Sequence, residues 1–261
     1  MPRISVLMGI YNCASTLQEA LDSLYAQTYN DFKIILCEDG SKDDTYAVAK
    51  AYAEKHDNIV LIRNDRNMGL NYTLNRCLEY ADTEYCARMD GDDISLPTRF
   101  EEEIAFLDTH PEYAIVSTPM QHFDEQGVFR VGRGTGEPKI TDFPKFSPFC
   151  HAPCMVRTEA YKQVGGYSVA DNLLREEDYH LWIKMYKKGY RGFNLSEPLY
   201  MMRDDRNALA RRTFMARKNE AYVKHLACKM LNLPFYYNIY CLRPLLLAVT
   251  PNWIYNILHR R

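Results

Sequence analysis

Three carboxylates crowd into four positions of the segment EYCARMDGDDISLP, residues 84–97. They are Asp90, Asp92 and Asp93, and they follow an apolar, strand-like run. Carboxylates this close repel each other and raise each other's pKa unless a cation lies between them. Mg²⁺ or Mn²⁺ prefers hard oxygen ligands and accepts phosphate oxygens as well. The cluster therefore indicates a divalent metal site, and the alternative is a solvated turn before a helix.

The elements that would position these carboxylates alternate regularly through residue 109. Strand-like runs read ISVLM, FKIILC, NIVLI and YCARM, and the expected helices cover 16–27, 43–56, 68–81 and 97–109. This alternation predicts a Rossmann-like α/β fold, with a mostly parallel central sheet and helices on both faces. Thr16 and Glu19 form a capping-box pattern at the first of these helices.

Polar loops follow all four strands, where ligands bind in open α/β sheets. They read GIYN, EDGSKDDT, NDRNMG and DGDD. Turn and cap chemistry explains any single one of them, but four such loops at one sheet edge favour a nucleotide site. Neither G-x-G-x-x-G nor G-x-x-x-x-G-K-[ST] occurs there, which disfavours dehydrogenases and P-loop enzymes.

The composition is that of a globular protein with asymmetric charge. Hydrophobic residues make up 47% of the 261 positions, enough for a sizeable core. The eight cysteines are expected to be reduced, and Cys150, His151 and Cys154 lack the further ligand that a zinc site needs. The N-terminus lacks a signal-peptide core, so we expect a cytoplasmic protein. With a net charge of -2, no nucleic-acid partner is expected.

The end of the chain differs from the rest in charge. Residues 203–261 carry eleven Lys/Arg against three Asp/Glu, a net +8 that leaves about −10 on residues 1–202. Residues 233–261 are aromatic and apolar, but no uninterrupted run reaches the ~18–20 residues that span a bilayer. The segment suits the interface at the inner face of the cell membrane, with Trp253, Tyr255, Arg260 and Arg261 near the headgroups. The alternatives are packing on its own domain or on a second subunit of a homo-oligomer.

Six motifs occur in an order that resembles glycosyltransferase family 2, specifically its bacterial polysaccharide-assembly members. They are ISVLMGIYN, ILCEDGSKDDT, NMGLNYTLN, ARMDGDDISLPTRF, VGGY and EEDYHLW. The resemblance covers about residues 3–205 and implies a GT-A catalytic domain at 1–205. Within it, about 1–110 would bind the nucleotide and about 111–205 the acceptor, which leaves 206–261 as a helical tail.

The resemblance also implies the reaction. Such an enzyme uses Mn²⁺ or Mg²⁺ and moves a sugar from a UDP-sugar, with inversion, to a hydroxyl of a saccharide or lipid-linked acceptor. Asp90-Gly91-Asp92 matches the D-x-D motif, in which Asp92 holds the metal on the donor diphosphate. Asp90 would contact the ribose or the metal, and Asp93 would orient neighbouring groups or start a helix.

The family pattern further implies which residues bind the nucleotide. Asp39 matches the acid that accepts a hydrogen bond from uracil N3–H, and Tyr11 matches an aromatic residue near the base. Asn67 and Gly69 match the loop after the third strand. Gly9 departs from the proline of many relatives, which affects the backbone leading to Tyr11.

Asp178, at the start of a helix, matches the family's general base. A base of this kind contributes about 10²–10⁴-fold to rate, whereas complementing the helix dipole is worth only ~0.3–1 kcal/mol. Glu177 would contact sugar hydroxyls. His151 would contact a sugar or serve as a core histidine, and His180, where relatives have an acid, is expected to be solvated.

Two further points stay open on the sequence. The chain lacks the histidine with which many relatives help to bind the diphosphate. An arginine is therefore expected to bind it, from among Arg203, Arg206, Arg211 and Arg212. The rival functions are a sugar-nucleotide pyrophosphorylase, whose glycine-rich basic loop is missing after the first strand, and a catalytically silent saccharide-binding module.

Overall fold

The computed structural model of the protein describes residues 2–132, 134–204 and 213–249. The strands are β1 (Ile4–Ile10), β2 (Phe32–Glu38), β3 (Ile59–Arg63), β4 (Tyr85–Arg88), β5 (Ile94–Ser95), β6 (Ile115–Ser117), β7 (Met120–Asp124), β8 (Gly127–Val131), β9 (Met155–Arg157), β10 (Gly192–Asn194) and β11 (Tyr200–Arg203). The α-helices are α1 (Leu17–Tyr25), α2 (Thr45–Ala53), α3 (Leu70–Glu79), α4 (Arg99–Thr109), α5 (Thr158–Val164), α6 (Glu177–Lys187), α7 (Phe214–Met230) and α8 (Leu242–Val249). Short 3₁₀ helices are η1 (Ile140–Asp142), η2 (Asp171–Leu173) and η4 (Phe235–Cys241).

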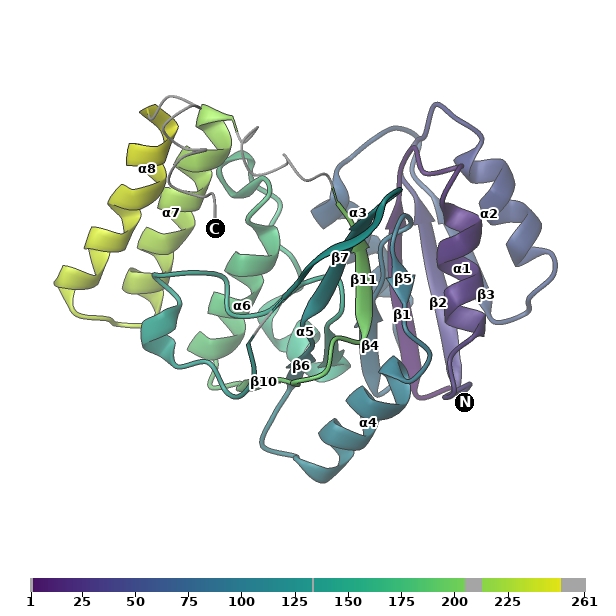
Figure 1. Cartoon of the computed structure of the whole chain (residues 1–261), viewed down its shortest axis with the longest axis horizontal. Helices are drawn as coiled ribbons and strands as arrows, with labels where there is room; N and C mark the ends of the chain where they lie inside the picture. The colour runs from purple at the N-terminus through teal and green to yellow at the C-terminus, as the bar shows by residue number, and fades with distance from the viewer. Residues whose placement is uncertain (1, 133, 205–212, 250–261) are drawn as a thin grey trace.

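A seven-stranded sheet in the order β10-β6-β9-β4-β1-β2-β3 forms the centre of the fold (Figure 1). β1 pairs in parallel with β2 and β4, and β2 with β3, while β9 runs antiparallel to β4 and β6. The carboxyl ends of β1 to β4 therefore meet at one edge. The predicted mostly parallel α/β sheet is confirmed, and the four expected helices appear as α1 to α4 with slightly shorter bounds.

Alternating side chains of β1 enter two different cores. Val6 and Met8 face the core formed with α1, α2 and α4, whereas Leu7 faces the core that includes α3, α5, α6 and α7. A strand points successive side chains to opposite faces, so a run of apolar residues serves both. Burying each of these side chains contributes about 1.5–3 kcal/mol, which explains why β1 carries apolar residues on both of its faces.

A second, four-stranded sheet in the order β5-β11-β7-β8 lies beside the first. β11 pairs antiparallel with β5, which begins directly after the acidic cluster, and parallel with β7. Sequence patterning did not predict this sheet, because β5 has two residues and β11 four. Its position matters for function, since β11 brings residues near 200 against the loop that follows β4.

The beginning of the C-terminal segment packs on the rest of the protein. Val223 and Ala227 of α7 belong to the same core as Trp182 of α6. η4 and α8 pack along α7 (Figure 1), with Phe235 87% and Leu246 64% exposed. None of the helices in the described part of the chain has both the length and the apolar character needed to cross a membrane. Trp253, Tyr255, Arg260 and Arg261 lie outside the described residues.

Candidate active site

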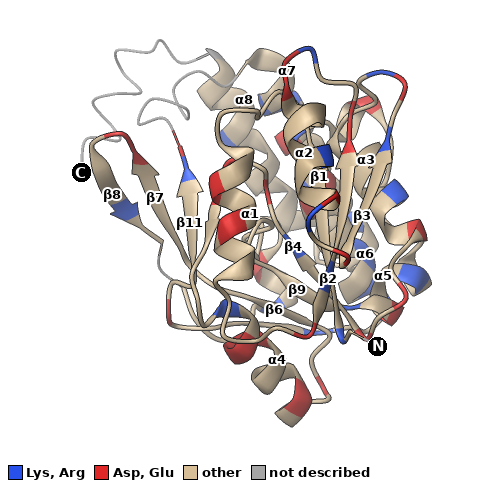
Figure 2. Cartoon of the chain, turned by 90° about the vertical axis from the view of Figure 1, so that its right-hand side faces the viewer, with Lys and Arg blue, Asp and Glu red and all other residues tan. Residues whose placement is uncertain are grey.

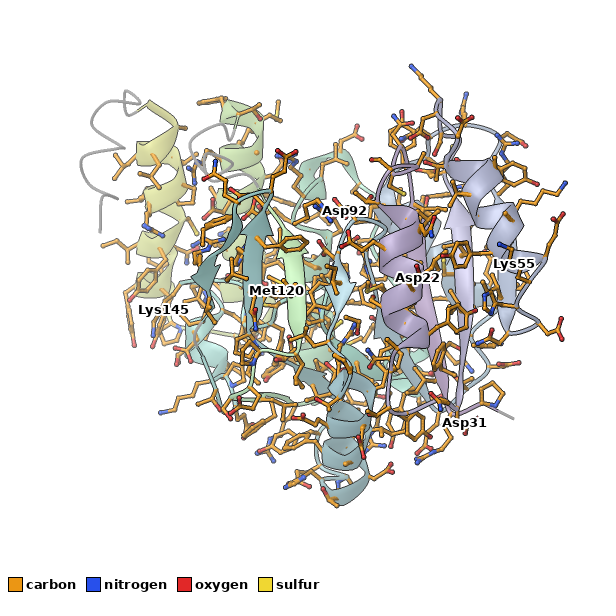
Figure 3. All side chains as sticks on the ribbon, turned by 45° about the vertical axis from the view of Figure 1, so that its right-hand side comes forward. Asp22, Asp31, Lys55, Asp92, Met120 and Lys145 are labelled. Atoms are coloured by element: carbon orange, nitrogen blue, oxygen red, sulfur yellow. The ribbon has the colours of Figure 1, made fainter. Side chains whose placement is uncertain are left out.

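A cavity of about 320 Å³ opens at the carboxyl edge of the central sheet. The residues that line it come from the end of β1, from the segments that follow β1 and β4, and from β11. They are Gly9, Ile10, Tyr11, Asn12, Cys13, Ser15, Thr16, Asp90, Gly91, Asp92 and Arg203. Figure 3 shows Asp92 at this end of the sheet, beside the start of α1. The fold thus brings the predicted aromatic residue and the predicted metal-binding acids into one cavity.

Asp92 is the exposed acid of the cluster. Desolvation by the surrounding protein and the negative charge of Asp90 raise the pKa of its carboxyl group. No group of three or more His, Cys, Asp or Glu side chains within residues 2–132, 134–204 and 213–249 is arranged to hold a metal. The donor set still fits Mg²⁺ or Mn²⁺, because such ions commonly take one or two carboxylates and complete their shell with water and substrate phosphates.

Asp90 and Asp93 have different surroundings. Asp90 Oδ1 accepts a hydrogen bond from Arg88 Nη2 at 2.5 Å, and its carboxylate is 31% exposed. Asp93 is 3% exposed and accepts the backbone N–H of Arg203 at 2.8 Å. Burial and the charges of Asp90 and Asp92 raise the pKa of Asp93 to about 8. Asp93 therefore connects the acidic loop to β11, and the alternative that it starts a helix is wrong.

Thr16 and Arg203 hold the two sides of the cavity together. The predicted capping box at Thr16 is wrong, because its hydroxyl donates to the carbonyls of Cys13 and Gly91 rather than accepting from the helix. Glu19, the other half of that pattern, pairs with Arg203 Nη2 at 2.6 Å. Arg203 Nε also donates to Asp92 O at 3.0 Å. The other arginine candidates, Arg206, Arg211 and Arg212, lie outside the described residues.

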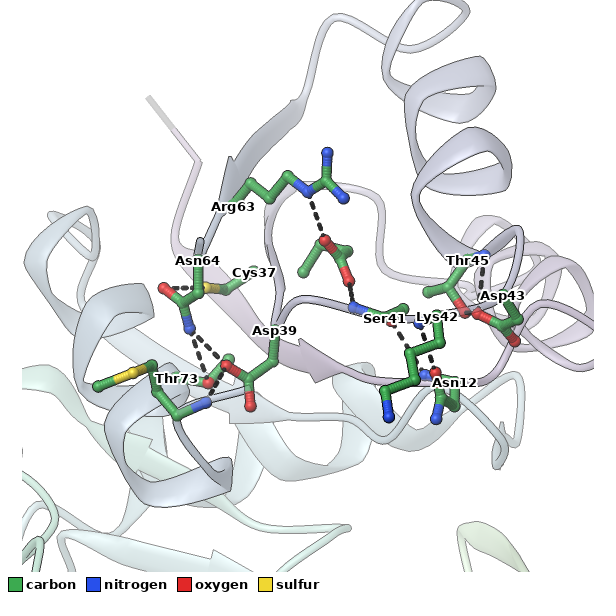
Figure 4. Close-up of polar contacts among 12 residues, drawn as sticks. Asn12, Cys37, Asp39, Ser41, Lys42, Asp43, Thr45, Arg63, Asn64 and Thr73 are labelled. Atoms are coloured by element: carbon green, nitrogen blue, oxygen red, sulfur yellow. Dashed lines mark hydrogen bonds and ion pairs between the residues drawn. The ribbon is translucent and has the colours of Figure 1, made fainter. Parts of the chain in front are cut away.

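Asp39 organises the loop after β3 (Figure 4). Its carboxylate accepts the N–H groups of Met68 and Gly69, both at 2.9 Å, and Asn64 Nδ2 at 2.7 Å. Gly69 has φ +91°, which only glycine adopts readily. Asn67 is exposed on the same loop. A carboxylate has about four acceptor positions, so these three bonds leave room for one more donor. Asn64 was not singled out in the sequence, because a single asparagine after a strand is an ordinary turn signal.

Asp178 and Glu177 lie in the first turn of α6. Burial, followed by the charge of Glu177, raises the pKa of Asp178 to about 7, and the positive charge of Arg88 opposes this. Burial likewise raises the pKa of Glu177. A partly buried carboxyl group that titrates near neutrality is suited to accept a proton.

Two histidines, His151 and His180, form hydrogen bonds with the segment between α5 and α6. His151 Nε2 lies 2.8 Å from Tyr167 Oη, and burial keeps the pKa of its imidazole well below 6.5, so the ring is neutral. His180 Nδ1 lies 3.0 Å from Ser168 Oγ, and burial lowers its pKa to about 4. The prediction that His180 is solvated is wrong, because α6 packs against the turn that contains Ser168.

The VGGY motif forms that turn and connects α3 to α6. Gly165 and Gly166 both have positive φ, +69° and +62°. Asn75 of α3 exchanges two hydrogen bonds with the backbone of Tyr167, at 2.7 and 2.8 Å, and Lys184 of α6 donates to the carbonyl of Gly166. α6, which carries Asp178, is thereby fixed relative to α3, the helix that follows the loop after β3.

We expect Gly166→Ala to lower the free energy of unfolding by about 2–4 kcal/mol. An alanine in the left-handed backbone conformation costs ~1–2 kcal/mol, and the new methyl group would also collide with Asn75 Oδ1. Gly165→Ala is the matched control, because its φ is similar but no atom lies within 4 Å of the added methyl group. It should cost only the ~1–2 kcal/mol of backbone strain. Denaturant titrations compare the two, and equal losses would show that the contact with Asn75 does not matter.

The family model for "Glycosyl transferase family 2" matches residues 5–165. EpsE of Bacillus subtilis is 42% identical over 263 residues, which cover 100% of this chain and 94% of that protein. WfaP of Escherichia coli, a UDP-Glc:α-D-GlcNAc-diphosphoundecaprenol β-1,3-glucosyltransferase, is 27% identical over 74% of each chain.

Solved structures with low sequence identity share the fold. S. aureus TarS in complex with UDP-GlcNAc aligns with a TM-score of 0.70 at 19% identity, covering 100% of this chain and 76% of that chain. The mannosyltransferase PcManGT of Pyrobaculum calidifontis, in complex with GDP-Man and Mn²⁺, aligns with a TM-score of 0.71 at 17% identity and the same coverage. The α/β architecture described above is therefore the fold that both of these structures share.

Proposed function

Because this chain belongs to glycosyltransferase family 2, we propose that it is an inverting, metal-dependent enzyme that uses a UDP-sugar. The acceptor is a hydroxyl group of a saccharide or lipid-linked saccharide, in the synthesis of a cell-surface polysaccharide. WfaP, whose name gives UDP-Glc as donor and a lipid-linked GlcNAc diphosphate as acceptor, supports this choice of substrates. A pyrophosphorylase is set aside, because the matched family model is one of glycosyl transferases.

The observation that carries the proposal is the cavity shared by Tyr11, Asp90, Asp92 and Arg203. Asp92, with Asp90, would hold Mn²⁺ or Mg²⁺. Tyr11, 39% exposed, offers a ring face to the uracil base, and Asp39 offers its remaining acceptor position to N3–H. Asn67 and Gly69 would complete the nucleotide site, and Arg203, the candidate arginine that lines the cavity, would bind the diphosphate.

The transfer itself would use the acidic start of α6. Asp178 takes the proton of the acceptor hydroxyl, the acceptor oxygen forms a bond to the anomeric carbon, and the bond from that carbon to the UDP oxygen breaks on the opposite face. The metal, when bound, supplies positive charge for the departing diphosphate. Glu177 and the neutral His151 would bind sugar hydroxyls beside the base.

Product analysis tests the function. The purified protein is incubated with UDP-glucose, UDP-galactose or UDP-GlcNAc and a short-chain GlcNAc-diphosphate lipid, with Mn²⁺ or with EDTA. Metal-dependent release of UDP together with a β-linked product is expected for one donor. A protein that binds UDP but releases none from any donor in the panel, with or without acceptor, would instead be a binding module.

The rate of transfer should rise with pH through about 7, because the active form of Asp178 is the carboxylate and its pKa is about 7. Below that value the group is protonated and cannot accept the acceptor's proton. The rate under saturating donor and Mn²⁺ is measured from pH 5.5 to 8.5, with donor affinity measured at each pH. A rate that does not change across this window would contradict a base of this pKa.

We also propose that the tail, 233–261, contacts the inner face of the membrane that carries the acceptor. Phe235, Ile239 and Leu246 are 87%, 66% and 64% exposed, an arrangement that favours an apolar contact. The basic excess of residues 203–261 complements anionic headgroups. By contrast, α1 and α4 carry acidic residues, which are red in Figure 2.

Changing Phe235, Ile239 and Leu246 together to serine should weaken binding to phosphatidylglycerol-containing vesicles at least about tenfold, because apolar burial of this size is lost. Vesicle sedimentation measures this, and circular dichroism checks the fold. Changing Val128 and Val131, 47% and 50% exposed on β8, to serine is the control and should not alter binding. If the triple variant sediments like the wild type, the tail does not make this contact.

A further inference from the structure

Arg88, at the end of β4, is a fully buried arginine that pairs with Asp90. Its side chain is 0% exposed. Nη2 donates to Asp90 Oδ1 at 2.5 Å, Nη1 donates to the carbonyl of Met89, and Nε has no hydrogen-bond partner among the described residues. Removing a charge from water costs several kcal/mol per ion, and pairing compensates only when the geometry is good. A buried guanidinium with an unpartnered nitrogen therefore lowers the stability of the fold, which suggests that Arg88 has a functional role.

Titratable groups from several separate segments of the chain surround Arg88. The groups whose pKa Arg88 changes, or that change its pKa, are Asp90 and Asp92 after β4, Tyr200 in β11, Cys77 in α3, His151 and Cys154 before β9, Tyr167 after α5, and Glu177 and Asp178 in α6. Burial opposes the charge of Arg88, but its interactions with Asp90, Tyr167 and Tyr200 outweigh this effect and raise its pKa, so the guanidinium stays protonated. The same positive charge lowers the pKa of Asp92, Glu177 and Asp178.

The backbone fixes Arg88 in this place. Its N–H donates to Cys154 O at 2.9 Å, and its own carbonyl accepts Arg99 Nη2 at 2.9 Å. β4 also pairs with β1, where Leu7 is opposite Arg88. The guanidinium is thus held by the sheet itself, while the acids around it lie in loops and at a helix start.

We propose that Arg88 is a positioning residue that links the donor side of the site to the base side. Its guanidinium holds the Asp90 carboxylate in one orientation by a charge-assisted hydrogen bond, and its positive charge is shared by the acids of both sides. The inference rests on the proposed function, and it adds a residue that the D-x-D and base assignments do not include.

Arg88→Met tests the proposal, because it removes the charge and the hydrogen bonds but keeps most of the buried volume. UDP affinity in the presence of Mn²⁺ should fall about tenfold or more, as expected when a partner of a metal-binding carboxylate is lost. The acid limb of the pH–rate profile should move to higher pH, because without the positive charge of Arg88 the carboxyl group of Asp178 stays protonated up to a higher pH. Calorimetry and the pH–rate profile are the two measurements.

Arg88→Lys and Arg157→Met make the test decisive. The lysine variant keeps a positive charge without the planar fork, so it should retain the wild-type acid limb while binding UDP·Mn²⁺ more weakly. Arg157, on the neighbouring strand β9, donates to the carbonyls of Tyr113 and Leu107, so its loss should lower stability but leave UDP affinity and the acid limb unchanged.

Two outcomes would overturn the proposal. One is a folded Arg88→Met with wild-type UDP affinity and an unmoved acid limb, which would make Arg88 purely structural. The other, which applies even if the methionine variant does not fold, is an Arg88→Lys variant whose acid limb moves upward despite its charge. Failure of the wild type itself to bind UDP with Mn²⁺ would count against the proposed function instead.

Discussion

Replacing Asp178 by asparagine is expected to lower the rate of sugar transfer by about 10²-fold or more, while the affinity for the UDP-sugar stays near the wild-type value. The amide cannot accept the proton of the acceptor hydroxyl. It has nearly the same size as the carboxyl group and caps a helix equally well, so the change should have little effect on folding. The transfer rate under saturating donor and Mn²⁺ is measured beside donor affinity on the same sample.

Glu176→Gln is the matched control for this experiment. Glu176 lies two residues before Asp178, at the start of the same helix, and is 7% exposed. If acids at this helix start act only on the dipole, worth ~0.3–1 kcal/mol, both variants should lose similar, small amounts of activity. An Asp178→Asn variant that keeps more than about a tenth of the wild-type rate would argue against a general base at this position, and Glu177 would be tested next.

Asp92→Ala should abolish the part of UDP binding that depends on metal. Asp92 is the exposed acid of the cluster, and a bound cation would oppose the desolvation and the charge of Asp90 that raise its pKa. Changing even an indirect partner of a metal typically costs 10–100-fold in affinity, so loss of a direct ligand should cost at least about tenfold. Titration calorimetry with UDP, in Mn²⁺ and in EDTA, measures the difference.

Thermal stability gives an independent measure of the same effect. Wild-type protein should gain stability by RT ln(1 + [L]/Kd) when UDP and Mn²⁺ are added together, and Asp92→Ala should not. Asp65→Ala is the control, because Asp65 is also an exposed acid in a loop at this sheet edge. It should bind UDP and Mn²⁺ as the wild type does. Unchanged affinity in Asp92→Ala would remove Asp92 from the metal site.

The fold was largely predictable because it depends on periodic patterns. β1 is a short, mostly apolar run, and α3 repeats apolar residues at helical spacing, so local patterning was enough to identify both elements. The second sheet was not predictable, because β5 and β11 are short and pair across about a hundred residues. His180 and Thr16 were misjudged for the same reason, since their hydrogen-bond partners, Ser168 and Gly91, are distant in sequence.

Composition and motif order in the sequence were sufficient for the α/β class, the family and the identity of the candidate acids, because those properties belong to short segments. The division at residue 205 and the roles of single residues stay predictions. The three-dimensional fold was needed to bring Arg203 to Asp92, to bury Asp93 against β11 and to set Arg88 among carboxylates from the β4 loop and α6. Burial and charge–charge distance depend on all the surrounding segments at once, and no single segment contains that information.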